Sequence, residues 1–340
     1  MPSRPSLTLA GVLTTAAGLA LFVWLVWYVG PAAIWAGFRQ IGWGLAAIVA
    51  IAGLRFAVRA AAWQRCLEPP HRLRFADAFA AVVSGDAVGN LTPLGPIVGE
   101  PAKAAFVRAR VPIGAALTAL AIENVLYTLS VAAMIAAGSI ALLLRADVAA
   151  PLRNAGEIAI AGVFGLYVVT LWTLWRRPAV LSRAVAAFAR WTSSASLGAR
   201  VEKVKALEDQ VYTFASRRRH ALLPLAALEL AFHALGVLEV HLTLWMLLPQ
   251  PPLLITSFVL ETVNRLITVV FKPVPMQVGV NEAGTAVVTQ MIGMGLEVGL
   301  TLAIVRKARI LFWMLVGTVL LVRQGLLTRR VLEDAHVHPE

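Results

Sequence analysis

Charged residues and prolines interrupt a long apolar run near the C-terminal end of the chain. Residues 264–284 read NRLITVVFKPVPMQVGVNEAG and include Arg265, Glu282, Pro273 and Pro275. A charge at the centre of a spanning helix costs roughly 2.5–3.5 kcal/mol on insertion scales, so these side chains are not expected to face lipid. The prolines remove backbone donors and favour a break in the helix. Because a broken backbone survives at membrane depth only inside protein or beside a watery cavity, the stretch predicts a functional site.

Two further apolar runs carry polar and ionisable side chains. Glu123 and Asn124 lie near the middle of one run, and Glu229 and His233 lie one helical turn apart in another. The second pair could relay protons, bind a metal ion or make polar contacts inside a helix bundle. We treat Glu229 and His233 as proton-relay candidates and expect no metal site, because no metal-ligand spacing stands out in the sequence.

The composition places these residues in a membrane protein. The chain has 340 residues, of which 59% are hydrophobic and 14% charged, and its mean hydropathy is +0.77. Such values are typical of polytopic membrane proteins. The net charge of +12 is divided among short loops, which indicates membrane orientation and attraction to anionic lipid rather than a nucleic-acid surface. Cys66 is the only cysteine, which excludes an internal disulfide and a cysteine-based metal cluster, and no cofactor is expected.

The apolar runs predict an all-α polytopic membrane protein that forms a single integral membrane domain over residues 1–340. We expect about six spanning helices, each with roughly 20 apolar residues. They cover residues 7–29, 42–62, 113–144, 158–175, 221–248 and 299–322. Arginine-rich loops place both termini on the cytoplasmic side, with a short outer loop over residues 31–40. We expect the membrane to be a bacterial inner membrane.

Residues 178–219 are expected to form a cytoplasmic amphipathic connector between the two halves of the chain. Apolar residues recur there at three- and four-residue steps from Leu197 to Phe214, and Arg200 and Lys203 lie on the opposite side. This pattern is typical of a helix that lies on the membrane surface. It would rest on anionic headgroups or dock a partner.

Residues 75–110 and 253–294 each favour a re-entrant helical hairpin. Both combine an apolar helix, a proline pair, a glycine and a glutamate, which are Pro93, Pro96, Gly99 and Glu100 in the first and Pro273, Pro275, Gly279 and Glu282 in the second. The first hairpin would enter from the cytoplasm and the second from outside. This opposite sense is the pattern of inverted-topology repeats, whose broken helices meet near the midplane and form a substrate site.

The segments PVPMQVGVNEA, residues 273–283, and NLTPLGPIVGE, residues 90–100, resemble the lysylphosphatidylglycerol synthase transmembrane-region family of flippase-like membrane proteins. That family shows a proline, a glycine-rich turn and then Gly-Val-Arg-Glu-Ala. The matching residues are Pro275, Gly279, Val280, Glu282 and Ala283. Met276 and Gln277 replace the usual double glycine, and Asn281 replaces the usual arginine. Other residues that look like family positions are Pro96, Gly99, Glu100 and Arg309.

The resemblance covers nearly the whole chain and implies a lipid translocase or lipid transporter. In the two-domain aminoacyl-lipid synthases, a soluble transferase domain follows the membrane half. Few residues follow the last expected span of this chain, so we expect no transferase domain. The Gly-Val-Asn-Glu-Ala variant is similar to a stand-alone branch associated with hopanoid biosynthesis. We expect anionic or isoprenoid membrane lipids as partners, lipid-biosynthesis enzymes as candidate protein partners, and no nucleic acid.

The candidate substrate site lies between the two expected hairpins. Its residues are Asn90, Pro96, Gly99, Glu100, Lys103, Glu123, Asn124, Glu261, Asn264, Arg265, Pro275, Gly279, Asn281, Glu282, Arg306 and Arg309. Arg306 and Arg309 are three residues apart on one helical face, and guanidinium forks suit phosphate oxygens. We expect Glu100 and Glu282 to pair with nearby cations until a lipid enters. Those cations are Lys103, Arg265 and Arg306.

The sequence leaves the energy source and one rival function open. It contains no nucleotide-binding pattern of the G-x-x-x-x-G-K-[ST] type, so transport would run downhill or be coupled to an ion gradient. The alternative is an integral-membrane transferase, with Glu100 and Glu282 as acid and base, or an accessory subunit of a lipid-modifying pathway. No catalytic motif stands out, and we expect the protein not to be an enzyme.

Overall fold

The computed structural model describes residues 27, 31–90, 95–144, 150–176, 180–191, 201–250, 252–272, 274 and 277–337, and within these ranges every regular element is a helix. The helices are α2 (Pro31–Ile41), α3 (Gly44–Cys66), α4 (Phe75–Asn90), α5 (Gly95–Phe106), α6 (Ile113–Leu143), α7 (Ala150–Arg176), α8 (Val180–Trp191), α10 (Val201–Arg217), α11 (Arg219–Leu247), α12 (Leu254–Val270), α13 (Val280–Met291) and α14 (Leu296–Val337). The all-helical fold class is confirmed for the described residues.

Four of the described helices, α3, α6, α7 and α11, are long and apolar enough to cross a membrane. Large apolar side chains on their outer faces, such as Leu230 on α11 and Phe164 on α7, are 71% exposed, as expected of surfaces that contact lipid. Of the other two expected spans, residues 7–29 lie outside the described residues apart from Trp27, and residues 299–322 form part of α14.

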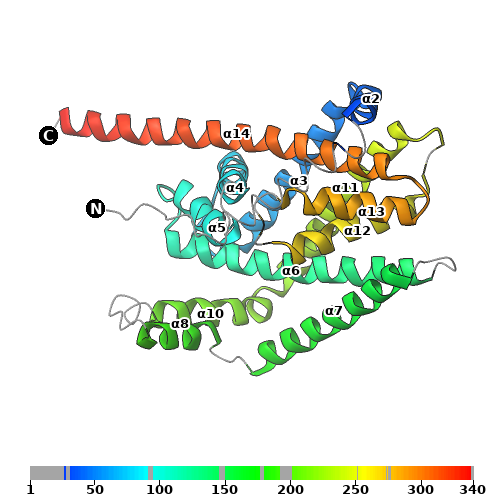
Figure 1. Ribbon diagram of the computed structural model, residues 1–340. Coiled ribbons are helices and arrows are strands. Elements are labelled where there is room, and N and C mark those ends of the chain that lie inside the picture. The colour runs from blue at the N-terminus through cyan, green and yellow to red at the C-terminus, as the bar shows by residue number, and fades with distance from the viewer. Residues whose placement is uncertain are drawn as a thin grey trace.

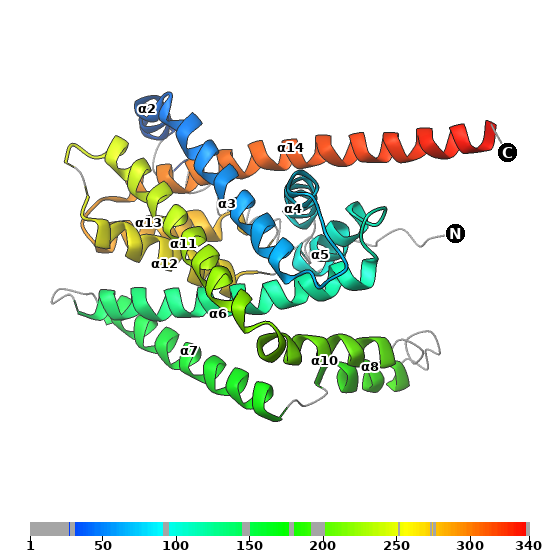
Figure 2. The same cartoon turned by 180° about the vertical axis from the view of Figure 1, so that it is seen from behind.

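The two largest apolar clusters among the described residues hold the helices together in the arrangement of Figure 1. The first core joins α3, α4, α5, α6 and the start of α11 around Trp63 and Leu225. The second core joins the ends of α6 and α11 to α12, α13 and α14 around Leu244 and Leu260. In both views α14 lies along one edge of the bundle, α3 and α11 lie between it and α6, and α7 lies on the far side of α6 (Figure 2).

The two stretches expected as hairpins form packed helix pairs. In the first, α4 lies against α5, and a Cβ added to Gly85 would lie 2.8 Å from the carbonyl oxygen of Gly99. The helix backbones approach this closely because neither position carries a side chain. In the second, α12 lies against α13, which begins after Gly279 at φ +81°. The re-entrant character of these pairs and the inverted repeat stay predictions.

The connector forms two helices, α8 and α10, which lie beyond α6 on the side away from α14 (Figures 1 and 2). They pack against each other, and the backbone N–H of Ser182 donates a hydrogen bond to Glu208 across 3.0 Å. Residues 192–200 between them lie outside the described residues.

One local expectation is wrong, because residues 31–40 form most of helix α2 instead of a loop. Pro31 occupies its first position, where the missing N–H has no helical partner to lose. Four residues separate Trp35 from Arg39, whose guanidinium carbon lies 5.5 Å from the Trp35 ring centroid. Such a cation–π pair one turn apart stabilises a short helix.

Candidate functional site

Polar residues occupy the middle of α6 and α11, between the two apolar cores. Along α6 the buried Glu123 follows Leu120 of the first core, and Leu142 of the second core lies further on. Along α11 the buried Glu229 and Glu239 lie between the two cores in the same way. Both helices are long enough to span a bilayer, and these carboxylates lie well inside them, where unpaired charges are costly.

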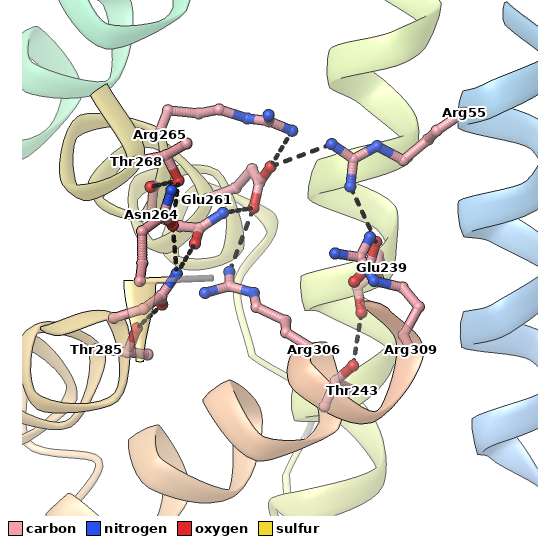
Figure 3. A network of polar contacts seen from close by, with 12 residues as sticks. Arg55, Glu239, Thr243, Glu261, Asn264, Arg265, Thr268, Thr285, Arg306 and Arg309 are labelled. Carbon is pink, nitrogen blue, oxygen red and sulfur yellow. Dashed lines mark hydrogen bonds and ion pairs between the residues drawn. The ribbon is translucent and has the colours of Figure 1, made fainter. Parts of the chain in front are cut away.

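Four arginines from three helices converge on two carboxylates (Figure 3). We call this set the arginine cluster; its members are Arg55 on α3, Glu239 on α11, Glu261 and Arg265 on α12, and Arg306 and Arg309 on α14. Arg55 and Glu239, for example, are 184 residues apart in the sequence, so only the tertiary fold brings the cluster together.

Glu261 is the carboxylate with the most partners in the cluster. It is 2% exposed and lies 2.7 Å from Arg265 and 3.2 Å from Arg306. It also accepts a hydrogen bond from the amide of Asn264 across 3.2 Å. Gly236 on α11 makes room for it, since a Cβ there would lie 2.7 Å from a Glu261 oxygen.

Glu239 is the second carboxylate and joins α3 to α14. Its Oε2 lies 2.7 Å from Arg309 and 3.1 Å from Arg55. Arg55 also reaches Glu261 at 4.0 Å, so it links the two carboxylates. Its guanidinium carbon lies 4.6 Å from the ring centroid of Phe232, which adds a cation–π contact.

The arginine cluster carries more positive than negative charge. Four guanidiniums share two carboxylates, which leaves an excess of two positive charges in a buried location. Several buried guanidinium N–H groups have no hydrogen-bond acceptor among the described residues, and these are Nε of Arg55, Arg265 and Arg309 and Nη1 of Arg306. The cluster can therefore accept an anion with several oxygens, such as a phosphate.

A neighbouring group of side chains on α3, α6 and α11 carries more negative than positive charge, because one arginine there lies against two carboxylates. Arg59 contacts both oxygens of Glu123, at 2.7 and 2.9 Å, and lies 4.0 Å from Glu229. The Arg59 guanidinium carbon also lies 4.0 Å from the ring centroid of Tyr127. The Tyr127 hydroxyl accepts a hydrogen bond from Arg265 across 3.3 Å, which connects this group to the arginine cluster.

The proton-relay candidates meet at Ser130 on α6. The Ser130 hydroxyl donates to Glu229 across 2.9 Å and lies 3.0 Å from Nε2 of His233. The His233 ring is stacked on Tyr127, with an interplanar angle of 10°. A hydroxyl that bridges a carboxylate and an imidazole can pass a proton between them. No trio of His, Cys, Asp or Glu suited to a metal ion occurs in the part of the chain that the structure describes.

Uncharged polar side chains extend the arginine cluster along α12 and α13 (Figure 3). We call this set the amide ladder; its members are Asn264, Thr268, Gln277, Asn281 and Thr285. Asn281 donates to Asn264 across 3.1 Å and accepts from Thr285 across 3.2 Å. Asn264 in turn donates to Glu261, so the ladder is continuous with the cluster.

Glu282 pairs with Lys307 at 3.2 Å, whereas we expected Arg265 or Arg306 as its partner. Both expected cations lie against Glu261 instead. Glu282 is fully buried on α13, and Lys307 lies one residue along α14 from Arg306.

The remaining predicted residues lie mainly on α4 and α5. Glu100 pairs with Lys103 at 2.7 Å, as expected, and Gly99 makes the close contact with α4. None of the hydrogen bonds and ion pairs seen among the described residues links this pair to the arginine cluster. The Asn90 amide donates within its own helix to the carbonyl oxygen of Asp86 across 3.0 Å and to the Asp86 carboxylate across 2.9 Å.

Three predicted residues remain, Asn124, Pro96 and Pro275. Asn124 donates to the carbonyl oxygen of Leu120 across 2.9 Å, which is a local helix contact. Pro96 lies in the first turn of α5, but its side chain, like all of Pro275, lies outside the described residues.

Sequence reasoning missed Arg55, Arg59 and Glu239 as site residues. The two arginines lie within the expected span of residues 42–62, toward the end that the basic residues after it mark as cytoplasmic. In the structure α3 extends from Gly44 to Cys66, so both lie well inside it. A charged residue that far from either end of a spanning helix indicates a functional role, and this criterion would have identified both arginines as site residues.

The comparisons with known proteins identify the family of the chain. The family model described as lysylphosphatidylglycerol synthase TM region matches residues 13–317, which confirms the family expected from the two proline- and glycine-containing segments. No curated protein and no solved structure was found to match. The chain therefore belongs to the lysylphosphatidylglycerol synthase transmembrane-region family, which indicates a multi-pass membrane protein of lipid metabolism or transport.

Proposed function

We propose that the protein binds the phosphate-bearing headgroup of an anionic membrane lipid at the arginine cluster and moves that lipid across the bilayer. The observation that carries this proposal is the buried excess of two positive charges, where four guanidiniums share Glu239 and Glu261. Buried ionisable residues in membrane proteins mark substrate or ion pathways. Guanidinium groups are suited to phosphate because their N–H donors match its oxygens in pairs.

The two carboxylates act as internal counter-ions in this proposal. A polar headgroup that crosses about 30 Å of hydrocarbon needs substitutes for its hydration. The arginines supply donors, and the lipid phosphate displaces Glu239 and Glu261 from part of their contacts. The headgroup passes between the α4–α5 pair and the α12–α13 pair, which would act as the two opposed re-entrant hairpins. Both termini lie in the cytoplasm of a bacterial cell in this arrangement.

Proton movement through Glu229 and His233 supplies the coupling. Ser130 bridges the two side chains, and Tyr127 connects them to Arg265 of the arginine cluster. A proton that enters this group changes the charge balance beside the cluster. No catalytic residue is part of the proposal.

The test is lipid translocation in proteoliposomes that contain fluorescent phosphatidylglycerol. We expect Arg306→Gln and Arg309→Gln each to slow translocation by roughly 10- to 100-fold, since a hydrogen bond to a charged group contributes about 1.5–3 kcal/mol. Arg323→Gln is the matched control, because Arg323 is exposed on the same helix.

Unchanged rates in both cluster variants, with normal folding, would refute the proposed mechanism. A chemically modified lipid product without translocation would instead support the integral-membrane transferase. Translocation that appears only with a second lipid-pathway protein would support an accessory subunit.

A further inference from the structure

We infer that a second, basic pocket beside the end of α3 binds a phosphate group, and that this phosphate belongs to an anionic phospholipid of the adjacent leaflet. The pocket shares no residue with the arginine cluster, so the inference goes beyond the proposed translocation. We call it the loop pocket; its volume is about 600 Å³, which is within the usual range of ligand pockets. Its basic lining residues are Arg65, His71, Arg72 and Arg218.

Arg218 joins the loop pocket to the second half of the chain. It lies between α10 and α11, and its Nη1 donates to the carbonyl oxygens of Arg65 and Leu67 across 3.1 and 2.8 Å. Its guanidinium carbon lies 5.8 Å from the ring centroid of Phe214. These contacts hold the side chain in place, while Nε and Nη2 have no acceptor among the described residues and can donate to a ligand.

The turn after α3, residues 67–74, is fixed as well. Gln64 donates to the carbonyl oxygen of Leu73 across 2.6 Å, and the backbone N–H of His71 donates to the carbonyl oxygen of Glu68 across 3.0 Å. Leu67 and Leu73 are buried in the first apolar core. Because this frame already holds the basic groups together, a ligand has little chain to order when it binds.

The loop pocket carries positive charge without a counter-charge. Among the described residues, no carboxylate lines it, and Arg65, Arg72 and Arg218 take part in no ion pair. By contrast, Arg110 after α5 is paired with Asp77. Guanidiniums donate in pairs to phosphate oxygens, and the same positive charge disfavours a metal cation.

The position of the loop pocket favours a lipid phosphate over a soluble one. Since α3 is long enough to cross a membrane, the turn directly after it lies at the level of the headgroups, on the side that its arginines predict to be cytoplasmic. Basic pockets beside spanning helices on that side suit acidic headgroups. Phe75, at the start of α4, is 48% exposed and offers an apolar surface beside the turn. A bound headgroup would link the end of α3 to the start of α11.

The test is the rise in Tm of the full chain in detergent as phosphatidylglycerol, phosphatidylcholine or inorganic phosphate is added. Arg65→Gln/Arg72→Gln removes two lining charges and leaves Arg218, which also holds the backbone. Every protein in the series carries Arg306→Gln, so that binding at the arginine cluster contributes little whatever the translocation assay shows. We expect the phosphatidylglycerol concentration at half of the Tm rise to increase roughly 30-fold in the pocket variant. Phosphatidylcholine and inorganic phosphate should have little effect.

The matched control is Arg74→Gln/Arg108→Gln, which removes two exposed arginines that do not line the loop pocket and should keep the original midpoint. Arg72→Gln alone, at an exposed position, should shift the midpoint roughly fivefold and replaces the double variant if that fails to fold.

Equal midpoints in the pocket and control variants would overturn the inference and leave lipid translocation standing. A Tm rise with phosphatidylcholine as large as with phosphatidylglycerol would overturn it too, because the pocket would then not select an anion. An equal rise with inorganic phosphate, lost in the pocket variant, would assign the site to a soluble phosphate and overturn the lipid assignment.

Discussion

Replacing Glu261 with glutamine should destabilise the protein and make its stability depend on anionic lipid. Glu261 neutralises Arg265 at 2.7 Å and Arg306 at 3.2 Å and lies 4.0 Å from Arg55. The glutamine has a similar shape but no charge, so the excess of the cluster rises from two positive charges to three. Breaking a buried ion pair by removing one partner costs about 3–5 kcal/mol, and we expect a loss in this range.

Denaturant titration in detergent micelles, with and without phosphatidylglycerol, would measure this effect. The free energy of unfolding of Glu261→Gln should recover more on lipid addition than that of the wild type, because a bound phosphate replaces the missing charge. The double variant Glu261→Gln/Arg306→Gln should lose less free energy of unfolding than the two single variants lose in sum. The difference, which is the coupling free energy, should be about 0.5–3 kcal/mol.

Glu297→Gln provides the control for this experiment. Glu297 is exposed in the first turn of α14, and such surface changes usually stay within about 0.5 kcal/mol. A loss in Glu261→Gln no larger than that of the control, or no extra stabilisation by lipid, would refute the view that Glu261 is an internal counter-ion.

Two further changes test the packing and geometry around the cluster. Gly236→Ala should lower the free energy of unfolding by about 1–3 kcal/mol, because its Cβ would lie 2.7 Å from a Glu261 oxygen. The control is Gly162→Ala on α7, where a Cβ meets nothing within 4 Å. This change should be neutral or stabilising by up to about 1 kcal/mol. Arg59→Lys should cost about 1–2 kcal/mol in the same titration, because lysine cannot contact both oxygens of Glu123 as the guanidinium does at 2.7 and 2.9 Å. Equal effects of the two glycine changes, or a stable Arg59→Lys, would contradict these contacts.

Apolar length and the position of prolines and glycines were enough to predict most of the helices. The runs around α3, α6 and α11 are long and uniform, so the requirement of a bilayer-spanning length locates them. The break after α12 followed from the prolines and charges of residues 264–284. Helix α2 was missed because its 11 residues are too few to span a bilayer, and only its local amphipathic spacing indicated a helix.

The pairing of the charged residues could not be predicted from the sequence. Arg306 and Arg309 were expected to bind phosphate from their spacing, and Glu261 was expected in the site. Their actual partners depend on how α3, α11 and α14 are arranged in space, and Arg55 and Glu239 are 184 positions apart. A spacing along one helix defines which face a residue occupies, but not which helix that face meets.

The basic residues of α14 have a mechanical consequence. Arg306 contacts Glu261 on α12, Lys307 contacts Glu282 on α13, and Arg309 contacts Glu239 on α11. Successive helical residues are about 100° apart, so Arg306 and Arg309 lie on one face of α14 while Lys307 points to a different side of the same axis. A rotation or an axial slide of α14 must therefore break the contacts with all three neighbouring helices together. Any movement of α14 therefore disturbs the whole polar centre at once.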